Sequence, residues 1–145
     1  MRLVVDSNIL LRCLLRFEGR VSELYLNPPE ELELFGPERL VAELSLHRPK
    51  VVKYTGGSPA RIAELEEMLM SHVTIVPNSR ILAAHWEHAF NLVKDIDEDD
   101  DQFVALALHL NCPLWTGDKK LVNGLRRKSF KLLITSDELR KKLGA

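Results

Sequence analysis

Residues 3–8 read Leu-Val-Val-Asp-Ser-Asn, and this stretch predicts a buried strand that passes directly into a helix. Its first half is a short apolar run with β propensity. Its second half consists of residue types that favour the first position of a helix. An apolar segment from Ile9 to Phe17 follows and is expected to be that helix. The acid Asp6 therefore stands at the carboxyl end of a predicted strand.

The same alternation of short strands and helices continues along the chain. Pro49 predicts a kink or break in the second helix, and Met68 is expected on the apolar face of the third. The expected strands after the first are 32–35, 73–76, 114–116 and 132–134, and the expected helices are 9–17, 37–47, 58–69, 79–93, 102–110, 119–125 and 136–143. This order predicts an α/β fold with a largely parallel sheet, in one domain that spans residues 1–145.

The amino-acid composition indicates which class of protein this chain belongs to. The chain is 46% hydrophobic and 28% charged, which is typical of a globular protein. No run approaches the ~18 apolar residues of a membrane span, and no secretion signal is recognisable, so we expect no membrane association and a cytoplasmic location. Cys13 and Cys112 lie in apolar surroundings and are expected to be buried, unpaired thiols.

The net charge of −1 conceals a separation of charge along the chain. Acids concentrate at residues 95–101, and basic residues concentrate at 119–120, 126–131 and 140–142. This distribution is compatible with a basic rim around an acidic centre.

Two acids follow predicted strands, Asp6 after the first and Asp118 after the fourth. Open parallel sheets carry their sites at the carboxyl ends of the strands. Neighbouring strands lie ~4.8 Å apart, so carboxylates at adjacent strand ends can meet around one cation. Each acid also suits the N-cap of the helix that follows it, and the residues alone leave both interpretations open.

Glu43 and the turn at residues 95–101 supply further acids. Glu43 lies beside the apolar stripe of the second helix, where it either faces a site or pairs with Arg39 or His47. The turn carries six acids in seven positions, and a cation would relieve their repulsion. A solvated turn with helix-capping acids, Asp99 and Gln102 resembling a capping box, is the alternative.

Other metal sites are poorly supported. His85 and His88 are three residues apart, but no third ligand and no HExxH pattern accompany them. The acidic turn lacks the glycine and glutamate of a calcium loop at the sixth and twelfth positions from Asp95. Trp86 and Trp115 are expected to be core or dimer-contact residues.

Taken together, the segment Asp6-Ser-Asn-Ile-Leu, Glu43, the run Asp100 to Ala107 and the segment Thr116-Gly-Asp118 resemble the PIN-domain nuclease family, in particular the VapC toxins of VapBC toxin–antitoxin pairs. The resemblance covers nearly the whole chain. It implies a five-stranded parallel sheet in the order 3-2-1-4-5, with helices on its faces, which places the first and fourth strands side by side.

The resemblance also implies a function and a set of site residues. It implies a Mg²⁺- or Mn²⁺-dependent endoribonuclease, the toxin of a type II pair, with RNA as substrate, an antitoxin partner and a homodimeric state. The implied catalytic and metal-binding acids are Asp6, Glu43, Asp100 and Asp118. The resemblance implies Asp100 because Asp100 stands 18 positions before Asp118, as in the family pattern, and Asp97 is the next candidate, before Asp99 and Asp101.

Two further groups of residues complete the prediction. Asn8 and Thr116 resemble the polar side chains that orient the family's acids. On the helices after Asp6 and Asp118, basic residues are candidates to bind the RNA backbone. These are Arg12, Arg16, Lys119 and Lys120.

Two other enzyme classes that carry acids at strand ends do not fit these residues. A receiver domain needs paired acids after the first strand and a lysine after the last, where Thr135 and Ser136 stand. A haloacid-dehalogenase-type phosphatase needs Asp-x-Asp, and the third position here is Asn8. The remaining alternative is a non-catalytic PIN-fold module that binds RNA or a partner. Metal titration separates it from a nuclease, because such a module would not hydrolyse RNA.

Overall fold

The computed structural model describes residues 1–145 and contains one parallel sheet. The strand order is β3-β2-β1-β4-β5, which confirms the predicted topology. The strands are β1 (Arg2–Val5), β2 (Glu33–Pro37), β3 (Val73–Val76), β4 (Leu114–Trp115) and β5 (Leu133–Ile134). Pairing of Val5 with Trp115 brings the ends of β1 and β4 together.

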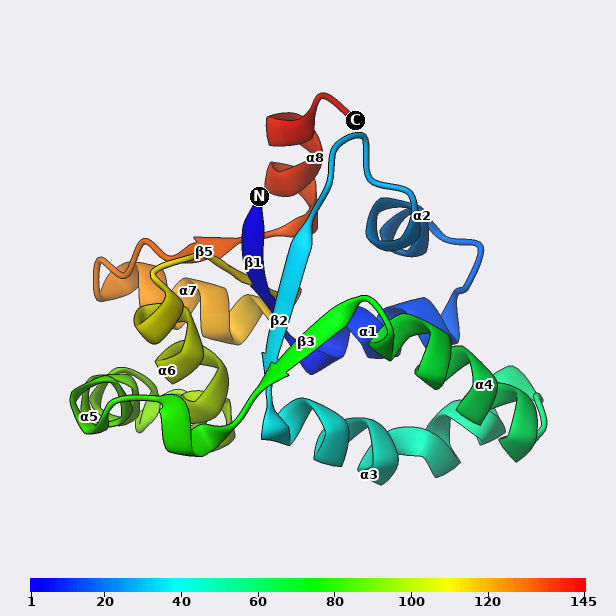
Figure 1. Cartoon of the computed structure of the whole chain (residues 1–145), viewed down its shortest axis with the longest axis horizontal. Coiled ribbons are helices and arrows are strands. Elements are labelled where there is room, and N and C mark those ends of the chain that lie inside the picture. Colours follow the sequence, from blue (N-terminus) through cyan, green and yellow to red (C-terminus); the bar gives the residue numbers. More distant parts are fainter.

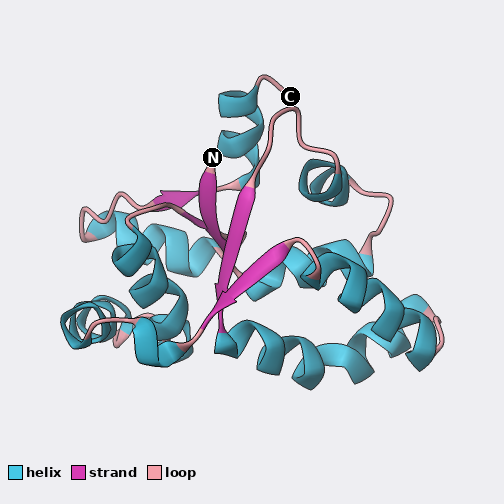
Figure 2. Ribbon diagram, viewed as in Figure 1, coloured by secondary structure: helices cyan, strands magenta, loops and turns pink.

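Eight α-helices and two short 3₁₀ helices surround the sheet (Figures 1 and 2). In Figure 1, α5, α6 and α7 lie to the left of the sheet, whereas α3 and α4 lie to its lower right. The helices are α1 (Ser7–Leu15), α2 (Arg20–Leu26), α3 (Glu38–Thr55), α4 (Pro59–Met70), α5 (Ala83–Val93), α6 (Asp101–Leu110), α7 (Lys119–Arg127) and α8 (Ser136–Leu143), with η1 (Asn78–Arg80) and η2 (Glu98–Asp100). None of these helices has the length and apolar composition needed to cross a membrane.

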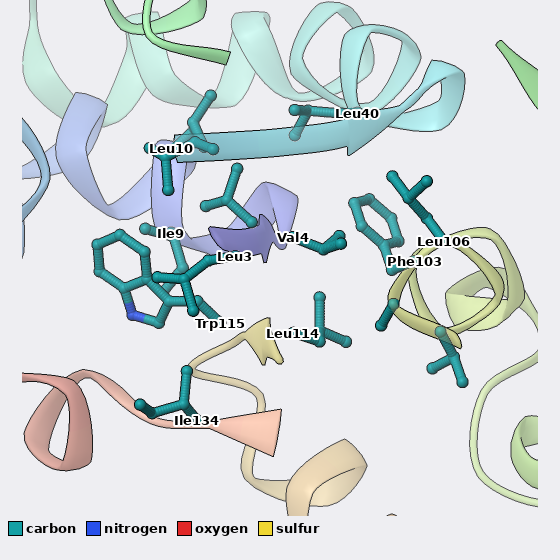
Figure 3. Close-up of a cluster of buried hydrophobic side chains, with 14 of the residues drawn as sticks. Leu3, Val4, Ile9, Leu10, Leu40, Phe103, Leu106, Leu114, Trp115 and Ile134 are labelled. Carbon is teal, nitrogen blue, oxygen red and sulfur yellow. The ribbon is translucent and has the colours of Figure 1, made fainter. Parts of the chain in front are cut away.

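The core forms around the two central strands (Figure 3). Leu3 and Val4 of β1 and Trp115 of β4 are completely buried, and α6 packs across β1, β2 and β4 with Phe103 inside. Full burial of such side chains stabilises a fold by about 1.5–3 kcal/mol each. Asp6 and Asp118 therefore follow strands whose apolar side chains are completely buried. Cys13 and Cys112 are buried and unpaired, as predicted.

Several element boundaries differ from the sequence prediction. The sequence predicted a helix to about residue 47 or beyond, with a kink or a break at Pro49; helix α3 continues through Pro49 to Thr55, so the chain does not break there. Pro49 and Ser45, whose carbonyl loses its helical partner, both face solvent, so water can satisfy that carbonyl. Packing of Leu44 and Val51 on either side of the proline holds the helix together.

The remaining differences are local. Helix α2 was not predicted, because a polar, proline-containing segment surrounds its seven residues. Strand β2 extends through Gly36 and Pro37, and the predicted helix 79–93 divides into η1 and α5. Met68 is 39% exposed, and Glu66 is the residue that α4 buries in addition to its apolar side chains.

Candidate metal centre

A cavity of about 370 Å³ opens at the carboxyl ends of β1 and β4, and we refer to it as the acidic cavity. It brings together acids from the end of β1, from α3, from the turn before α6 and from the end of β4. Its acidic lining residues are Asp6, Glu43, Asp97, Asp99, Asp100 and Asp118. The four acids that the family resemblance implied thus share one cavity, although they are spread over 113 positions of the sequence.

Asp6 is the most deeply buried of these acids, with 3% of its surface exposed. It occupies the N-cap position of α1, but its side chain makes no capping hydrogen bond. Its Oδ2 instead accepts hydrogen bonds from Thr116 Oγ1 at 2.7 Å and from Asn8 Nδ2 at 3.2 Å. The capping interpretation of Asp6 is therefore wrong, and its carboxylate is oriented toward the end of β4.

Asn8 and Thr116 tie the ends of β1 and β4 together. Thr116 Oγ1 accepts from the backbone N–H of Asp118 at 3.1 Å, and Asn8 Oδ1 accepts from the N–H of Gly117 at 3.1 Å. Asp118 does cap its helix, since its Oδ1 accepts from the N–H of Leu121 at 3.1 Å. Capping and proximity to Asp6 therefore coexist at Asp118.

Glu43 faces the acidic cavity and is also hydrogen-bonded within it. Its Oε1 accepts from Arg39 Nε at 2.8 Å, and its Oε2 accepts from the hydroxyl of Ser7. Arg39 reaches Asp99 as well, at 3.5 Å. The two interpretations left open for Glu43, a site residue and a partner of Arg39, are both compatible with this arrangement.

The acidic turn divides into buried and solvated acids. Asp100 is 9% exposed, and its Oδ2 is buried without a hydrogen-bond partner. Asp97 accepts from the N–H of Asp99 and caps η2, whereas the Asp99 side chain is 71% exposed. The expected capping box of Asp99 and Gln102 does not form, because Gln102 Oε1 accepts from the N–H of Arg39 instead.

Burial and mutual repulsion perturb two of the acids. Burial, reinforced by the charges of Glu43 and Asp118, raises the pKa of Asp6 to about 6, although the Thr116 hydrogen bond lowers it. Burial, followed by the charge of Asp6 and of other acids in the cavity, raises the pKa of Asp100 to about 8. These acids resist carrying negative charge together unless a cation accompanies them.

The donor set fits a hard divalent cation. Its ligand atoms are carboxylate oxygens, which Mg²⁺ and Mn²⁺ prefer, and the unpaired Oδ2 of Asp100 is an unsatisfied acceptor. As the side chains stand, no three His, Cys, Asp or Glu groups are close enough to hold one ion. The acids therefore line one cavity, but their side chains do not converge on a single ion position.

The sequence did not identify three polar residues of the acidic cavity as members of the site, namely Ser7, Arg39 and His47. Arg39, Glu43 and His47 are spaced four residues apart on α3, a spacing that places side chains on one helix face. That spacing was the signal available in the sequence.

A second cavity, of about 790 Å³, adjoins the first, and we refer to it as the basic cavity. It lies among α1, α7 and α8, and the two cavities share Asn8 and Leu11 as lining residues. Its basic lining residues are Arg12, Lys119, Arg126 and Arg140. Of the four basic residues named from the sequence, Arg12 and Lys119 line this cavity, whereas Arg16 and Lys120 line neither.

Comparisons with known proteins agree with this architecture. The model of the PIN domain family matches residues 4–140. The fold is similar to that of a solved chain of VapBC2 from Rickettsia felis bound to a DNA fragment from its promoter, with a TM-score of 0.68 and 14% identity over 94% of this chain and 98% of that chain. Among curated proteins, none matches the chain significantly in sequence.

Proposed function

This chain belongs to the PIN domain family, and from that premise we propose that it is a Mg²⁺- or Mn²⁺-dependent endoribonuclease that acts as the toxin of a type II toxin–antitoxin pair. PIN domains are generally nucleases. The observation that carries the proposal is the convergence of Asp6, Glu43, Asp100 and Asp118 on one cavity at the carboxyl ends of the strands.

In the proposed reaction, these four acids hold the ion and the surrounding side chains keep them in position. A bound divalent ion supplies Lewis-acid chemistry, making water more acidic and stabilising charge on the phosphate and the leaving oxygen. Thr116 and Asn8 orient the Asp6 carboxylate through hydrogen bonds. Arg39 and Ser7 restrain Glu43 through hydrogen bonds to its two carboxylate oxygens. Asp97 is the next candidate to bind the ion, because it lines the same cavity.

RNA requires attraction that the carboxylates do not provide. We propose that Arg12 and Lys119, which line the adjoining basic cavity, bind the RNA backbone, with Arg16 and Lys120 as weaker candidates. Neither Arg12 nor Lys119 is paired with a carboxylate in the structure, so both charges are available to phosphates.

The test is cleavage of RNA by the purified chain under titrated Mn²⁺ or Mg²⁺. We expect cleavage that rises with the ion, ceases in EDTA and is lost in Asp6→Asn with the fold intact by circular dichroism. Binding of RNA without hydrolysis at any Mn²⁺ concentration would favour the alternative, a non-catalytic RNA-binding module.

The toxin role requires a protein partner. The similar chain from Rickettsia felis belongs to VapBC2, and by analogy we propose an antitoxin for this chain. We expect a small open reading frame beside its gene whose product co-purifies with the chain and inhibits cleavage. A neighbouring product that neither binds nor inhibits would contradict this role while leaving the nuclease proposal untouched.

A further inference from the structure

The acidic turn (residues 95–101) packs against α7 through a contact that involves a glycine. Helices α5 and α6, which flank the turn, lie on the same side of the sheet as α7 (Figure 1). Gly124 lies inside α7, and a Cβ atom there would lie 2.5 Å from Cδ1, 2.8 Å from Cγ1 and 3.4 Å from Cγ2 of Ile96. The Ile96 side chain thus occupies space that only a residue without a Cβ leaves open.

Conformational freedom does not account for this glycine. Glycine is among the least favourable residues in the interior of a helix, and its usual advantage is that it tolerates positive φ angles. Among the glycines of this chain, positive φ angles occur only at Gly56 and Gly144. The missing side chain of Gly124 is therefore the property that the fold uses, because it lets α7 and the acidic turn approach each other closely.

Lys128, the C-cap residue of α7, attaches the same region at a second point. Its Nζ donates to the backbone oxygen of Leu92 at 2.6 Å and pairs with the carboxylate of Asp95. Leu92 belongs to the last turn of α5, where carbonyl groups lack partners within the helix. Gly124 and Lys128 are four residues apart, which places them on one face of α7. That face therefore holds the end of α5 and the beginning of the acidic turn.

The other end of α7 carries Asp118, one of the proposed ion ligands. Asp118 caps the helix, and Leu121 and Leu125 anchor it in the core with no exposed surface. Gly124 stands six positions after Asp118, which corresponds to about 9 Å along a helix that rises 1.5 Å per residue. A single rigid helix thereby connects Asp118 to the turn that carries Asp100.

We propose that Gly124 and Lys128 are positioning residues, through which α7 holds the acidic turn at a fixed distance from Asp118 so that Asp100 and Asp118 can bind the same ion. The inference rests on the proposed metal-dependent function and assigns a role in it to residues that do not touch the ion. Metal–ligand distances vary by only about 0.2 Å, so affinity for the ion depends on how accurately the turn is held.

A methyl group at Gly124 would displace the turn and not only one side chain. Carbon atoms in contact lie ~3.5–4.0 Å apart, so Ile96 would have to retreat by roughly 1 Å. Ile96 is branched at Cβ, and atoms of both branches lie beside Gly124. Rotation about the stiff χ1 angle therefore does not clear the space. The displacement passes to the backbone immediately before Asp97.

The test measures Mn²⁺ binding without RNA, from the electron paramagnetic resonance signal of free Mn²⁺, and amide hydrogen exchange of residues 94–101 in EDTA. Gly124→Ala is expected to weaken Mn²⁺ binding about tenfold, as loss of a supporting group does. It is also expected to speed exchange in residues 94–101 but not in β1. Asn123→Ala is the matched control, because it raises helix propensity at an exposed position of α7, and it should have neither effect.

A double variant identifies the contact. Ile96→Ala removes every atom that the new methyl group would meet, so in this background Gly124→Ala is expected to have no further effect on Mn²⁺ binding or on exchange. A purely structural role for Gly124 predicts a different result. It would lower the melting temperature and speed exchange throughout the chain, while the Mn²⁺ affinity of the folded protein would stay unchanged.

Lys128 and Arg127 form a second matched pair. Both are cationic and stand at the C-terminal end of α7, but only Lys128 contacts the end of α5 and the acidic turn. Removal of a positive charge by itself favours a nearby cation, so Arg127→Ala is expected to leave Mn²⁺ binding unchanged or slightly tighter. Lys128→Ala is expected to weaken Mn²⁺ binding about threefold or more, and to speed exchange in residues 94–101.

Several results would overturn the inference. These are an unchanged Mn²⁺ affinity or unchanged exchange in Gly124→Ala, the same loss of affinity in the Ile96→Ala background, and unchanged or tighter Mn²⁺ binding by Lys128→Ala. A wild-type chain that binds no Mn²⁺ contradicts the proposed function instead. In that case the exchange measurements in EDTA alone decide whether Gly124 and Lys128 hold the turn, because they do not depend on the ion.

Discussion

The acidic and basic cavities adjoin at Asn8 and Leu11, yet the chain builds them in different ways. The acidic cavity takes its central residues from strand ends, where backbone pairing and the Asn8–Thr116 hydrogen bonds leave Asp6 little freedom. The basic cavity takes most of its residues from the surfaces of three helices, and three of its four basic side chains, those of Arg12, Lys119 and Arg126, are exposed. In the proposed function, the strand ends hold the residues that require accurate placement, and the helix surfaces hold the residues that attract the RNA.

The largest expected effect comes from removing a charge at a strand end while keeping the structure. Asp118→Asn retains an oxygen to cap α7 at Leu121 but removes the negative charge. We expect cleavage to fall by roughly a thousandfold, because losing an ion ligand removes several kcal/mol of stabilisation from the transition state. The initial rate at saturating Mn²⁺ measures this effect.

The control for that prediction is the melting temperature of the metal-free protein. Asp118→Asn should melt close to the wild type, whereas Asp118→Ala should melt lower, because loss of a cap costs about 1 kcal/mol. Wild-type activity in Asp118→Asn would remove Asp118 from the site.

The second prediction concerns how much the charged acids of the acidic cavity lower the stability of the metal-free fold. The folded state holds protons on Asp6 and Asp100 more tightly than the unfolded chain does, since their pKa values rise from 3.8 to about 6 and about 8. Their stabilising contribution is therefore present below about pH 4 and is lost as the pH rises through about 6 and 8. For Asp6 alone the raised pKa corresponds to roughly 3 kcal/mol.

Asp100→Asn should consequently melt several degrees above the wild type in EDTA above about pH 8, with the difference vanishing near pH 4. Saturating Mg²⁺ should reverse the order, because ion binding stabilises the wild type. Asp99→Asn, at an exposed position in the same turn, is the control and should show neither effect. A melting temperature of Asp100→Asn that does not depend on pH relative to wild type would contradict the mutual repulsion.

The third prediction concerns a substitution that removes a hydrogen bond to Asp6 but keeps the Asp6 carboxylate. Thr116→Val deletes the hydroxyl that donates to Asp6 at 2.7 Å and accepts from the N–H of Asp118. Loss of such a supporting group typically costs 10–100-fold in metal affinity or activity, so we expect a loss of about that size. Because this hydrogen bond lowers the pKa of Asp6, the acidic limb of the pH–rate profile should move to higher pH. Thr116→Ser should restore both.

The smallest expected effect lies in the basic cavity. Arg12→Ala should weaken RNA binding only a few-fold, and the slope of log affinity against log salt should fall by about 0.7, the value for one phosphate on a single strand. Cleavage at saturating RNA should be unchanged. A large loss of turnover at saturating RNA would contradict the assignment of Arg12 to RNA binding alone, because Arg12 would then contribute to the cleavage step.

The two cavities also differ in how well the sequence predicts them. Strand alternation and short apolar runs predicted the sheet, and the position of Asp6 and Asp118 after strands predicted their proximity. The sheet order itself came from the family resemblance. The basic cavity was only partly predicted, because which face of α7 meets α1 and α8 depends on packing. Arg126 and Arg140 could not be assigned to it for that reason.

Within the acidic turn, the sequence offered no physical basis for choosing Asp100 over its neighbours. The choice followed from the resemblance, and burial now separates Asp100 from the exposed Asp99. The continuation of α3 through Pro49 and the presence of the unpredicted helix α2 have a common cause. Tertiary packing of Leu44 and Val51, and of Leu24 and Tyr25, outweighs local propensity there.

The hydrogen bonds of the two strand-end acids bear on the selectivity between ions. Asp118 uses Oδ1 for the backbone of α7, and Asp6 uses Oδ2 for Thr116 and Asn8. Each carboxylate is left with one oxygen free of strong hydrogen bonds, so monodentate coordination is the mode open to both. Mg²⁺, small and octahedral with retained waters, accepts such ligands, whereas Ca²⁺ commonly takes carboxylates in a bidentate manner. Chelation of Ca²⁺ by Asp118 would cost the first turn of α7 its cap, and we therefore expect the proposed site to bind Mg²⁺ in preference to Ca²⁺.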